Sequence, residues 1–352
     1  MGSKKKIIGN AVFLAIIFAL TVYGVFHGED MGELFDAIRE ADTKWLISGA
    51  ALVLFFIWGE SFIIWYMMRS FGIRLKKRIC FLFSSVGFFF SCITPSASGG
   101  QPMQIYFMKK EKIPIPVATV ILMIVTITYK LVLVVIGGGI LLFGRDFVDR
   151  YLSEAFSVFC LGLLLNVFCV GFMTVLVFHP ALAESILTKG MAWLERMRFL
   201  RRREERGRKL RSSMEVYRET AAYLKEHGKV LVTVALISFV QRIALFSVTW
   251  MVYLAFGLSG TGIWDVVFLQ AVISVSVDML PLPGGMGISE ALFLRIFPGV
   301  FGEAVLPAMV LSRGLGYYVQ LLASALFTIV AQIYYIWKEK AEKEAEQKGR
   351  TV

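Results

Sequence analysis

Ionisable side chains inside long apolar stretches are the residues of this 352-residue sequence that could do chemistry. Charged groups within a membrane are costly and by default mark functional sites. The cations could contact an anion such as a phosphate, and the carboxylates could form ion pairs or act as general bases. Each cation could equally belong to a purely structural ion pair, and both interpretations stay open. The residues concerned are Glu60, Lys130, Arg242, Asp278, Glu290 and Arg313.

Two segments rich in proline and glycine interrupt the apolar stretches, at Thr94–Pro102 and at Pro281–Gly287. Glycine leaves the backbone without a side chain, and the end of a half-helix exposes unpaired N–H groups that favour an anion. We therefore predict a lipid head-group site formed by Lys130, Arg242, Arg313, Tyr129, Gly99, Gly100, Gln101, Gly284, Gly285, Ser289 and Glu290. The predicted helix breaks involve Pro95, Pro102, Pro281, Pro283 and Gly287, and the candidates for proton or ion coupling are Glu60 and Asp278.

The composition is that of a membrane protein, since 57% of the residues are apolar and only 18% are charged, against roughly 25% charged residues in soluble domains. The formal net charge is +11, but the basic residues lie in loops beside the apolar segments, so we expect no nucleic-acid partner. The cysteines lie inside apolar segments without metal-binding spacing, and the histidines lie at segment ends. We therefore expect no metal, no cofactor and no catalytic triad.

Most lysines and arginines gather in a few loops, which the positive-inside rule places in the cytoplasm. The loops between them are acidic and are predicted to face outward. The pattern indicates a multi-pass protein of a bacterial or archaeal cytoplasmic membrane with both termini inside. The basic clusters are Lys4–Lys6, Arg69–Arg78, Lys109–Lys112, Pro180–Gly228 and Lys338–Arg350.

Eight apolar segments follow one another along the chain. Six are long enough to span a bilayer and start near Ile7, Trp45, Ile115, Phe156, Val230 and Val305. The other two contain the breaks, and the helix before each break is too short for a core of about 30 Å. Each of these segments is therefore predicted to dip into the membrane and return. The alternative is eight plain helices, two of them kinked.

The two halves of the sequence carry the same series of elements. After the first element, corresponding starts are separated by 185 to 190 residues, and the two halves begin on opposite faces. This predicts an all-α protein with two inverted-topology repeats, at about 7–143 and 156–337, and two opposed re-entrant helical hairpins around a mid-membrane cavity. Residues 1–337 form a single transmembrane domain with a basic cytoplasmic linker at 180–228, and a charged cytoplasmic tail covers 338–352.

The runs Thr94–Lys110 (TPSASGGQPMQIYFMKK) and Leu280–Phe293 (LPLPGGMGISEALF) together resemble the lysylphosphatidylglycerol synthase transmembrane family, which is MprF-type and flippase-like. The resemblance covers roughly residues 7–337. In the fused members a similar membrane portion is thought to flip aminoacylated phosphatidylglycerol, while a soluble C-terminal domain transfers the amino acid from tRNA. This sequence ends 15 residues after Trp337, so we expect no transferase domain. Gln101 stands where the family often has an acidic residue, whereas Glu290 keeps the acid of the second motif.

The preferred hypothesis is a flippase- or scramblase-like transporter that moves an anionic or aminoacylated phospholipid, such as lysylphosphatidylglycerol, or a polyprenyl-phosphate lipid, between leaflets. The alternative is a membrane-embedded lipid-modifying enzyme, or an accessory subunit, in phosphatidylglycerol lysyltransferase-type metabolism; the expected lack of a transferase domain disfavours an enzyme. The expected partners are membrane lipids, with anionic inner-leaflet lipids at Arg201–Arg211, and a second copy of the chain or a separate synthase. The resemblance also implies a connection with antimicrobial peptide resistance.

Overall fold

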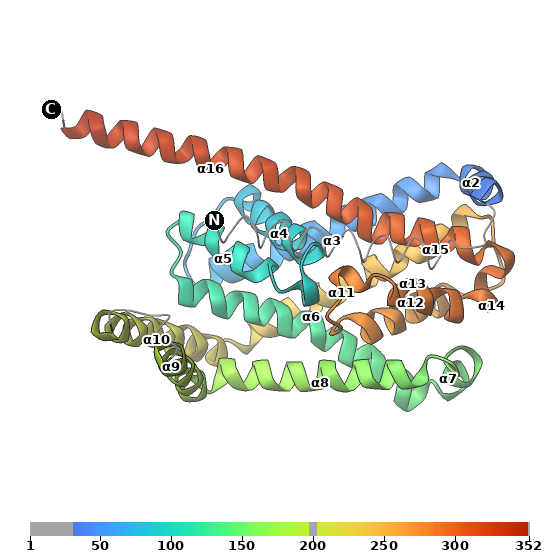
Figure 1. Cartoon of the computed structure of the whole chain (residues 1–352), viewed down its shortest axis with the longest axis horizontal. Coiled ribbons are helices and arrows are strands. Elements are labelled where there is room, and N and C mark those ends of the chain that lie inside the picture. Colours follow the sequence, from blue (N-terminus) through green and yellow to red (C-terminus); the bar gives the residue numbers. More distant parts are fainter. Residues whose placement is uncertain (1–30, 197–202, 351–352) are drawn as a thin grey trace.

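The computed structural model describes residues 31–196 and 203–350, and this part of the chain is all-helical, without strands. Five helical runs within it are long and apolar enough to cross a membrane. Figure 1 shows the long helices side by side in one bundle. These five runs confirm the multi-pass membrane architecture predicted from the composition. The predicted first span, from Ile7, lies outside the described residues.

The five runs coincide with predicted spans. Four begin within two residues of the predicted starts, and the fifth begins at Pro298, seven residues before the predicted Val305. Four are single helices, and the fifth runs from Pro298 to Glu342 through α14 (Pro298–Phe301), α15 (Val305–Arg313), a π-helical stretch (η4, Gly314–Val319) and α16 (Gln320–Arg350). The single helices are α3 (Thr43–Ser70), α6 (Ile115–Phe143), α8 (Phe156–Phe178) and α11 (Gly228–Ala255). The agreement follows from the length of each apolar run, which a helix spanning about 30 Å of hydrocarbon requires.

Two shorter helix pairs contain the predicted breaks. In the first, α4 (Lys77–Cys92) packs against α5 (Gly100–Lys110), and in the second, α12 (Ile263–Val277) packs against α13 (Ile288–Ile296). The chain therefore doubles back at each break. The turns between the helices, η1 (Pro95–Ala97) and η2 (Pro283–Gly285), contact each other.

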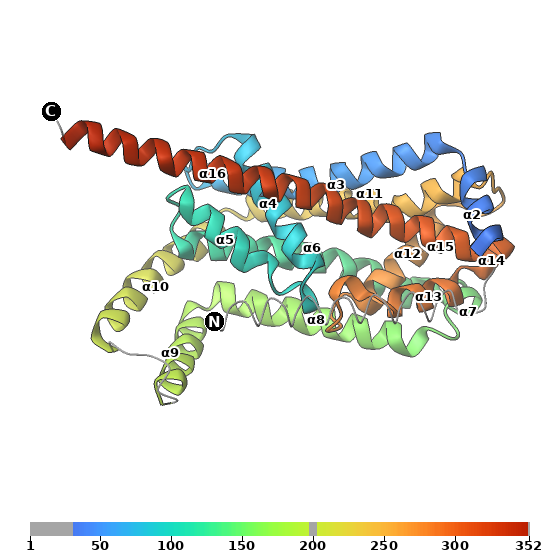
Figure 2. The same cartoon turned by 45° about the horizontal axis from the view of Figure 1, so that its top comes forward.

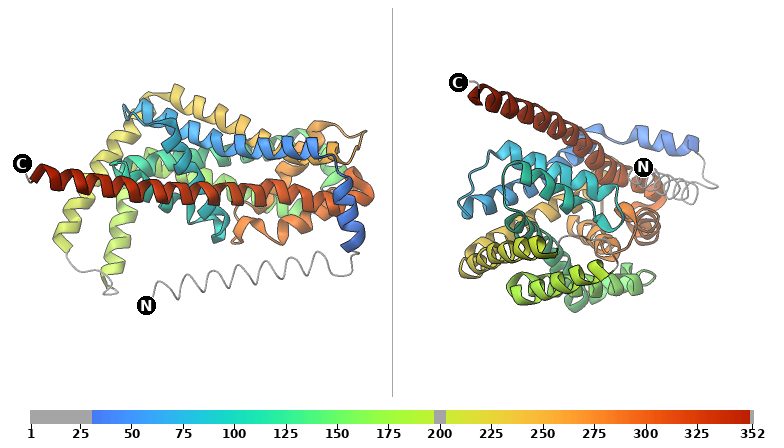
Figure 3. Two further views of the ribbon diagram at one scale, coloured as in Figure 1. Left: turned by 90° about the horizontal axis from the view of Figure 1, so that it is seen from above. Right: turned by 60° about the vertical axis from the view of Figure 1, so that its left-hand side comes forward.

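Charge is segregated between the two ends of the bundle. At one end, called the basic end below, lie the turns at 69–78 and 109–112, the helices α9 (Pro180–Arg196) and α10 (Arg203–Glu226), and the C-terminal part of α16. In Figure 2, α9 and α10 project away from the long helices at this end. The opposite, acidic end carries α2 (Met31–Glu40), α7 (Arg145–Tyr151) and α14, at the right of Figure 1 and of the left-hand view in Figure 3. This is the pattern that the positive-inside rule produces across a membrane.

The ends of the bundle are fastened by local interactions. At the acidic end, the Asp42 carboxylate accepts a hydrogen bond from the Lys44 backbone N–H and caps α3. The Asp42 N–H donates to the carbonyl of Ala255 at the end of α11, over 2.8 Å. At the basic end, ion pairs join Lys110 to Glu339 and Lys338 to Glu111. Two apolar clusters, one toward each end, fill the bundle and leave a polar region between them.

Candidate functional site

A cavity of about 620 Å³ lies inside the bundle, where the two helix breaks meet. Its walls come from both helix pairs, α4–α5 and α12–α13, with their turns η1 and η2, and from α3, α6, α8, α11, α15, η4 and α16. Lys130 and Arg242 line it from near the middle of α6 and α11. A cavity with charged walls halfway along spanning helices is an arrangement suited to a polar solute or head group crossing the membrane.

The structure places most of the predicted site residues on the wall of this cavity. Those that line it are Glu60, Gln101, Tyr129, Lys130, Arg242, Asp278, Gly284, Gly285, Ser289 and Arg313. The remaining predicted residues lie in or beside the turns without lining the cavity, and these are Pro95, Gly99, Gly100, Pro102, Pro281, Pro283, Gly287 and Glu290.

An ion pair joins α6 to the second break. The Lys130 ammonium contacts the Asp278 carboxylate, and the Tyr129 hydroxyl donates to the same carboxylate over 2.6 Å. The two charged side chains are about nine-tenths buried, with relative exposures of 11% and 12%. Because Asp278 follows α12 directly, this pair fixes the start of the second turn against the long helix α6.

A second ion pair holds the other side of the same break. The Arg313 Nε donates to the Glu290 carboxylate over 2.7 Å, and the Arg313 guanidinium also donates to the Gly284 carbonyl over 3.1 Å. Glu290 accepts two further hydrogen bonds, from the backbone N–H of Gly287 and from the hydroxyl of Ser289. Glu290 therefore organises the first turn of α13, and Arg313 holds this turn against α15.

Arg242 differs from the other two cations. It is 4% exposed, and among the described residues it has no ion pair or hydrogen-bonding side-chain partner; its Nε is a buried donor without an acceptor. Its guanidinium lies 3.2 Å from the ring centroid of Tyr129 and 5.3 Å from that of Phe56. Glu60 and Asp278 interact with it electrostatically, without hydrogen bonding to it. Aromatic stacking orients this cation while its N–H donors stay available to a ligand.

The first break is held by neutral amides. The Gln104 amide donates to the Glu60 carboxylate over 2.7 Å, and the Gln101 amide donates to the Thr126 hydroxyl. A Cβ at Gly87 would overlap the Gln104 amide, so this glycine lets α5 approach α4 closely. Gln104 was missed in the sequence analysis, although it stands three residues after Gln101 and therefore on the same face of a helix.

The two turns share a backbone conformation. Ser96 and Ala97 follow Pro95 with φ of 50° and 53°, and Gly284 and Gly285 follow Pro283 with φ of 57° and 67°. At the first break the left-handed backbone conformation is thus adopted by residues other than glycine. The predicted glycines, Gly99 and Gly100, do not adopt it. Gly99 has φ of −83°, and Gly100 belongs to α5, where a Cβ would overlap Ser91 of α4. The positive φ at Ser96 and Ala97 is unusual for side-chain-bearing residues and marks a strained turn.

Tyr317 connects the two turns. Its hydroxyl donates over 3.0 Å to the carbonyl of Cys92 at the end of α4, and a Cβ at Gly284 would overlap its ring. The Arg313 guanidinium lies 4.8 Å from the same ring. Tyr317 belongs to the π-helical stretch η4, a feature that occurs frequently at functional sites. The residue joins the first break, the second break and the last spanning run.

Within residues 31–196 and 203–350, no three His, Cys, Asp or Glu side chains lie close enough to hold a metal ion.

The model of the family described as "Lysylphosphatidylglycerol synthase TM region" matches residues 7–324. The chain belongs to this family. No curated protein matches the chain. Membership confirms the resemblance found in the two break motifs and indicates a membrane protein of lysylphosphatidylglycerol-related lipid metabolism.

Proposed function

We propose that this chain translocates a lipid with a phosphate-containing head group between the two leaflets of the membrane, in the manner of a flippase or scramblase. The observation that carries the proposal is Arg242, a buried guanidinium without a hydrogen-bonding partner among the described residues, on the wall of a cavity of about 620 Å³. An unpaired buried cation is costly and is expected to have an anionic ligand. Membership of the family agrees with a lipid as that ligand.

The proposed path follows from two opposed re-entrant hairpins. Before their breaks, α4 and α12 have 16 and 15 residues, which corresponds to roughly 22–24 Å of helix and is too short for a bilayer core. Pro283 follows Pro95 by 188 residues, and each proline precedes two residues with left-handed backbone. This match supports two inverted repeats, with α4–α5 entering from the basic end and α12–α13 from the acidic end.

The charges around the cavity suit a head group that carries both signs. Arg242 offers its free N–H donors to a phosphate. Among the described residues, Glu60 hydrogen-bonds only Gln104, so its carboxylate is available to an ammonium group. Lysylphosphatidylglycerol carries a phosphate together with ammonium groups, whereas phosphatidylglycerol and polyprenyl-phosphate lipids carry the phosphate alone. We therefore propose the aminoacylated phospholipid as the favoured substrate.

Reconstitution in liposomes tests this function directly. The purified chain should accelerate the exchange of a labelled phosphatidylglycerol between leaflets, measured as the fraction that an impermeant quencher reaches over time. Lysylphosphatidylglycerol added in excess should compete. Mass spectrometry of the recovered lipids should show no change of mass. A changed mass would instead support the alternative, a lipid-modifying enzyme, and an unchanged exchange rate would contradict the proposal.

The hairpin topology predicts which positions face the same side of the membrane. Single cysteines at Lys76, which precedes α4, and at Lys109, in the last turn of α5, should both react with an impermeant thiol reagent added from one side. Cysteines at Ser259 and Gly299, which flank the second pair, should both react from the other side. Gly299 tolerates the change because the nearest atom to an added Cβ is 4.0 Å away. Labelling of Lys76 and Lys109 positions from opposite sides would show that α4 and α5 cross the membrane. The background lacks the four native cysteines.

A further inference from the structure

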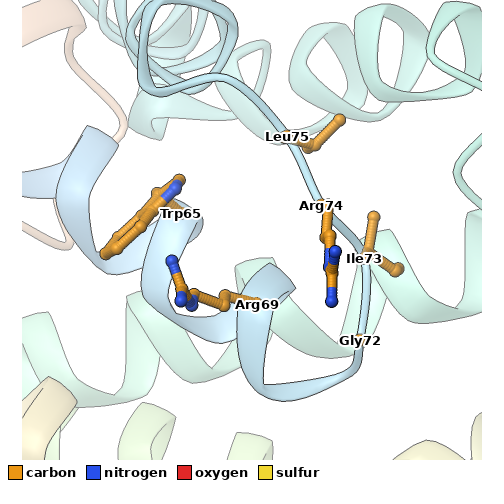
Figure 4. Close-up of a pocket in the computed structure, with 6 residues that line it drawn as sticks. All are labelled: Trp65, Arg69, Gly72, Ile73, Arg74 and Leu75. Atoms are coloured by element: carbon orange, nitrogen blue, oxygen red, sulfur yellow. The ribbon is translucent and has the colours of Figure 1, made fainter.

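A second cavity, of about 530 Å³, lies at the turn between α3 and α4, on the basic end of the bundle. We call it the turn pocket, and its lining residues are Trp65, Arg69, Gly72, Ile73, Arg74 and Leu75. Figure 4 shows Arg74 extending from the connecting loop beside the last turn of α3, with Arg69 and Trp65 across the hollow. None of these residues lines the central cavity.

The backbone of the turn pocket is held in place. Gly72 has φ of 76°, and its N–H donates to the Arg69 carbonyl while the Ile73 N–H donates to the Met68 carbonyl. These bonds form a Schellman motif, which ends α3 with its carbonyls satisfied. From α10, the Tyr223 hydroxyl donates over 2.8 Å to the Ser70 carbonyl. The two arginines therefore project from a preorganised turn, which lowers the entropic cost of binding a ligand.

Cations gather in the turn pocket without a counter-charge. Arg69 and Arg74 are exposed, and neither forms an ion pair within the part of the chain that the structure describes. Two cations contact the Trp65 ring, with the Arg69 Cζ at 5.4 Å and the Lys77 Nζ at 4.8 Å from its centroid. No acidic residue lines the pocket. Like charges that are held together in a hollow favour an anion that neutralises them.

The pocket lies at the depth of lipid head groups. Trp45 and Trp65 are 20 residues apart on α3, which is about 30 Å along a helix and equals the thickness of the hydrocarbon core. Tryptophan is enriched at both membrane–water interfaces. Arg69 follows Trp65 by one turn of α3, and Arg74 lies in the loop just after the end of this helix, at the level where phosphate groups begin. Ile73 and Leu75 supply an apolar part of the wall beside them.

We propose that the turn pocket binds the phosphate group of an anionic phospholipid from the leaflet at the basic end. The site is separate from the central cavity and does not depend on the translocation proposed above. Arginine suits this ligand because its planar guanidinium can donate two parallel hydrogen bonds to a phosphate. A lipid fits better than free phosphate, since the pocket combines an interfacial tryptophan with apolar side chains.

A photoactivatable phosphatidylglycerol with its reactive group near the head group tests the proposal. After illumination of the full chain in phosphatidylcholine nanodiscs, peptide mapping should find the label on residues 65–75. Unlabelled phosphatidylglycerol should compete for this labelling, whereas phosphatidylcholine and millimolar inorganic phosphate should not. The R69Q/R74Q variant should lower the yield of label on this peptide roughly 10- to 30-fold when the probe is subsaturating. Each arginine near an anionic membrane surface contributes about 1 kcal/mol of attraction, so the loss of two arginines corresponds to a fold-change of this size.

The matched control is R145Q/R150Q, which removes two exposed arginines from α7 at the opposite end. Its labelling of residues 65–75 should equal that of the native chain. An equal fall in both variants would show a general effect of net charge and overturn the proposal. Competition by phosphatidylcholine, or the absence of label on this peptide, would do the same. Competition by inorganic phosphate would assign the pocket to free phosphate instead of a lipid.

Discussion

Replacing Arg242 by methionine is expected to slow lipid exchange between leaflets roughly 10- to 100-fold, because a charge-assisted hydrogen bond contributes about 1.5–3 kcal/mol. Methionine retains much of the apolar volume that packs on Tyr129 and Phe56 but removes the charge. Burying a charge without an ion-pair partner costs free energy, so its replacement by an apolar residue should cause little loss of stability. The rate is measured in liposomes with phosphatidylglycerol labelled on an acyl chain, alongside the melting temperature in detergent.

Arg295→Met is the matched control for Arg242→Met. Arg295 is an exposed cation on α13 that does not line the central cavity. Its replacement removes the same charge and should leave the exchange rate unchanged. If both variants slowed exchange equally, the effect would come from net charge. If Arg242→Met exchanged lipid at the native rate, the guanidinium would have no part in head-group binding.

Replacing Glu290 by glutamine is expected to lower the free energy of unfolding by about 3–5 kcal/mol, the usual effect of removing one partner of a buried ion pair. The change leaves the guanidinium of Arg313 without a carboxylate, and Arg313 is only 19% exposed. The double variant Glu290→Gln/Arg313→Met should regain most of the lost stability because no uncompensated charge remains. Thermal unfolding in detergent, followed by size-exclusion chromatography, measures both variants.

The exchange rate of the double variant separates the two roles that the sequence left open for Arg313. A structural ion pair predicts that stability and lipid exchange recover together. A head-group contact predicts a stable protein that still fails to exchange lipid. If Glu290→Gln alone were as stable as the native chain, the Glu290–Arg313 pair would not hold the second break.

The helices, the two breaks and the residues that could carry charge into the membrane are all predictable from the order of amino acids alone. The lengths of the apolar runs placed α3, α6, α8 and α11 to within a few residues, because a spanning helix must satisfy its own backbone hydrogen bonds. Proline and glycine located both turns, since these residues act on the backbone locally. The membrane class and the family also follow from the sequence.

Which charges neutralise one another is visible only in the folded chain. Lys130 pairs with Asp278, which is 148 residues away along the chain, and Arg313 pairs with Glu290 across α15 and α13. Arg242 is left with aromatic rings and no hydrogen-bonding partner among the described residues. Three cations that look alike in an apolar sequence thus acquire different environments. Pairing depends on which helix faces meet, and that is a property of long-range packing.

In the two turns as well, the sequence predicts the location, and long-range packing sets the conformation of each residue. The sequence indicated two glycine-rich tips, but at the first tip the left-handed backbone falls on Ser96 and Ala97, while Gly100 allows α5 to pack on α4. Gln104 gains its role only because α5 packs on α4, which brings its amide to Glu60 of α3. Local sequence sets where a chain can turn, whereas the conformation of each residue in the turn depends on what packs around it.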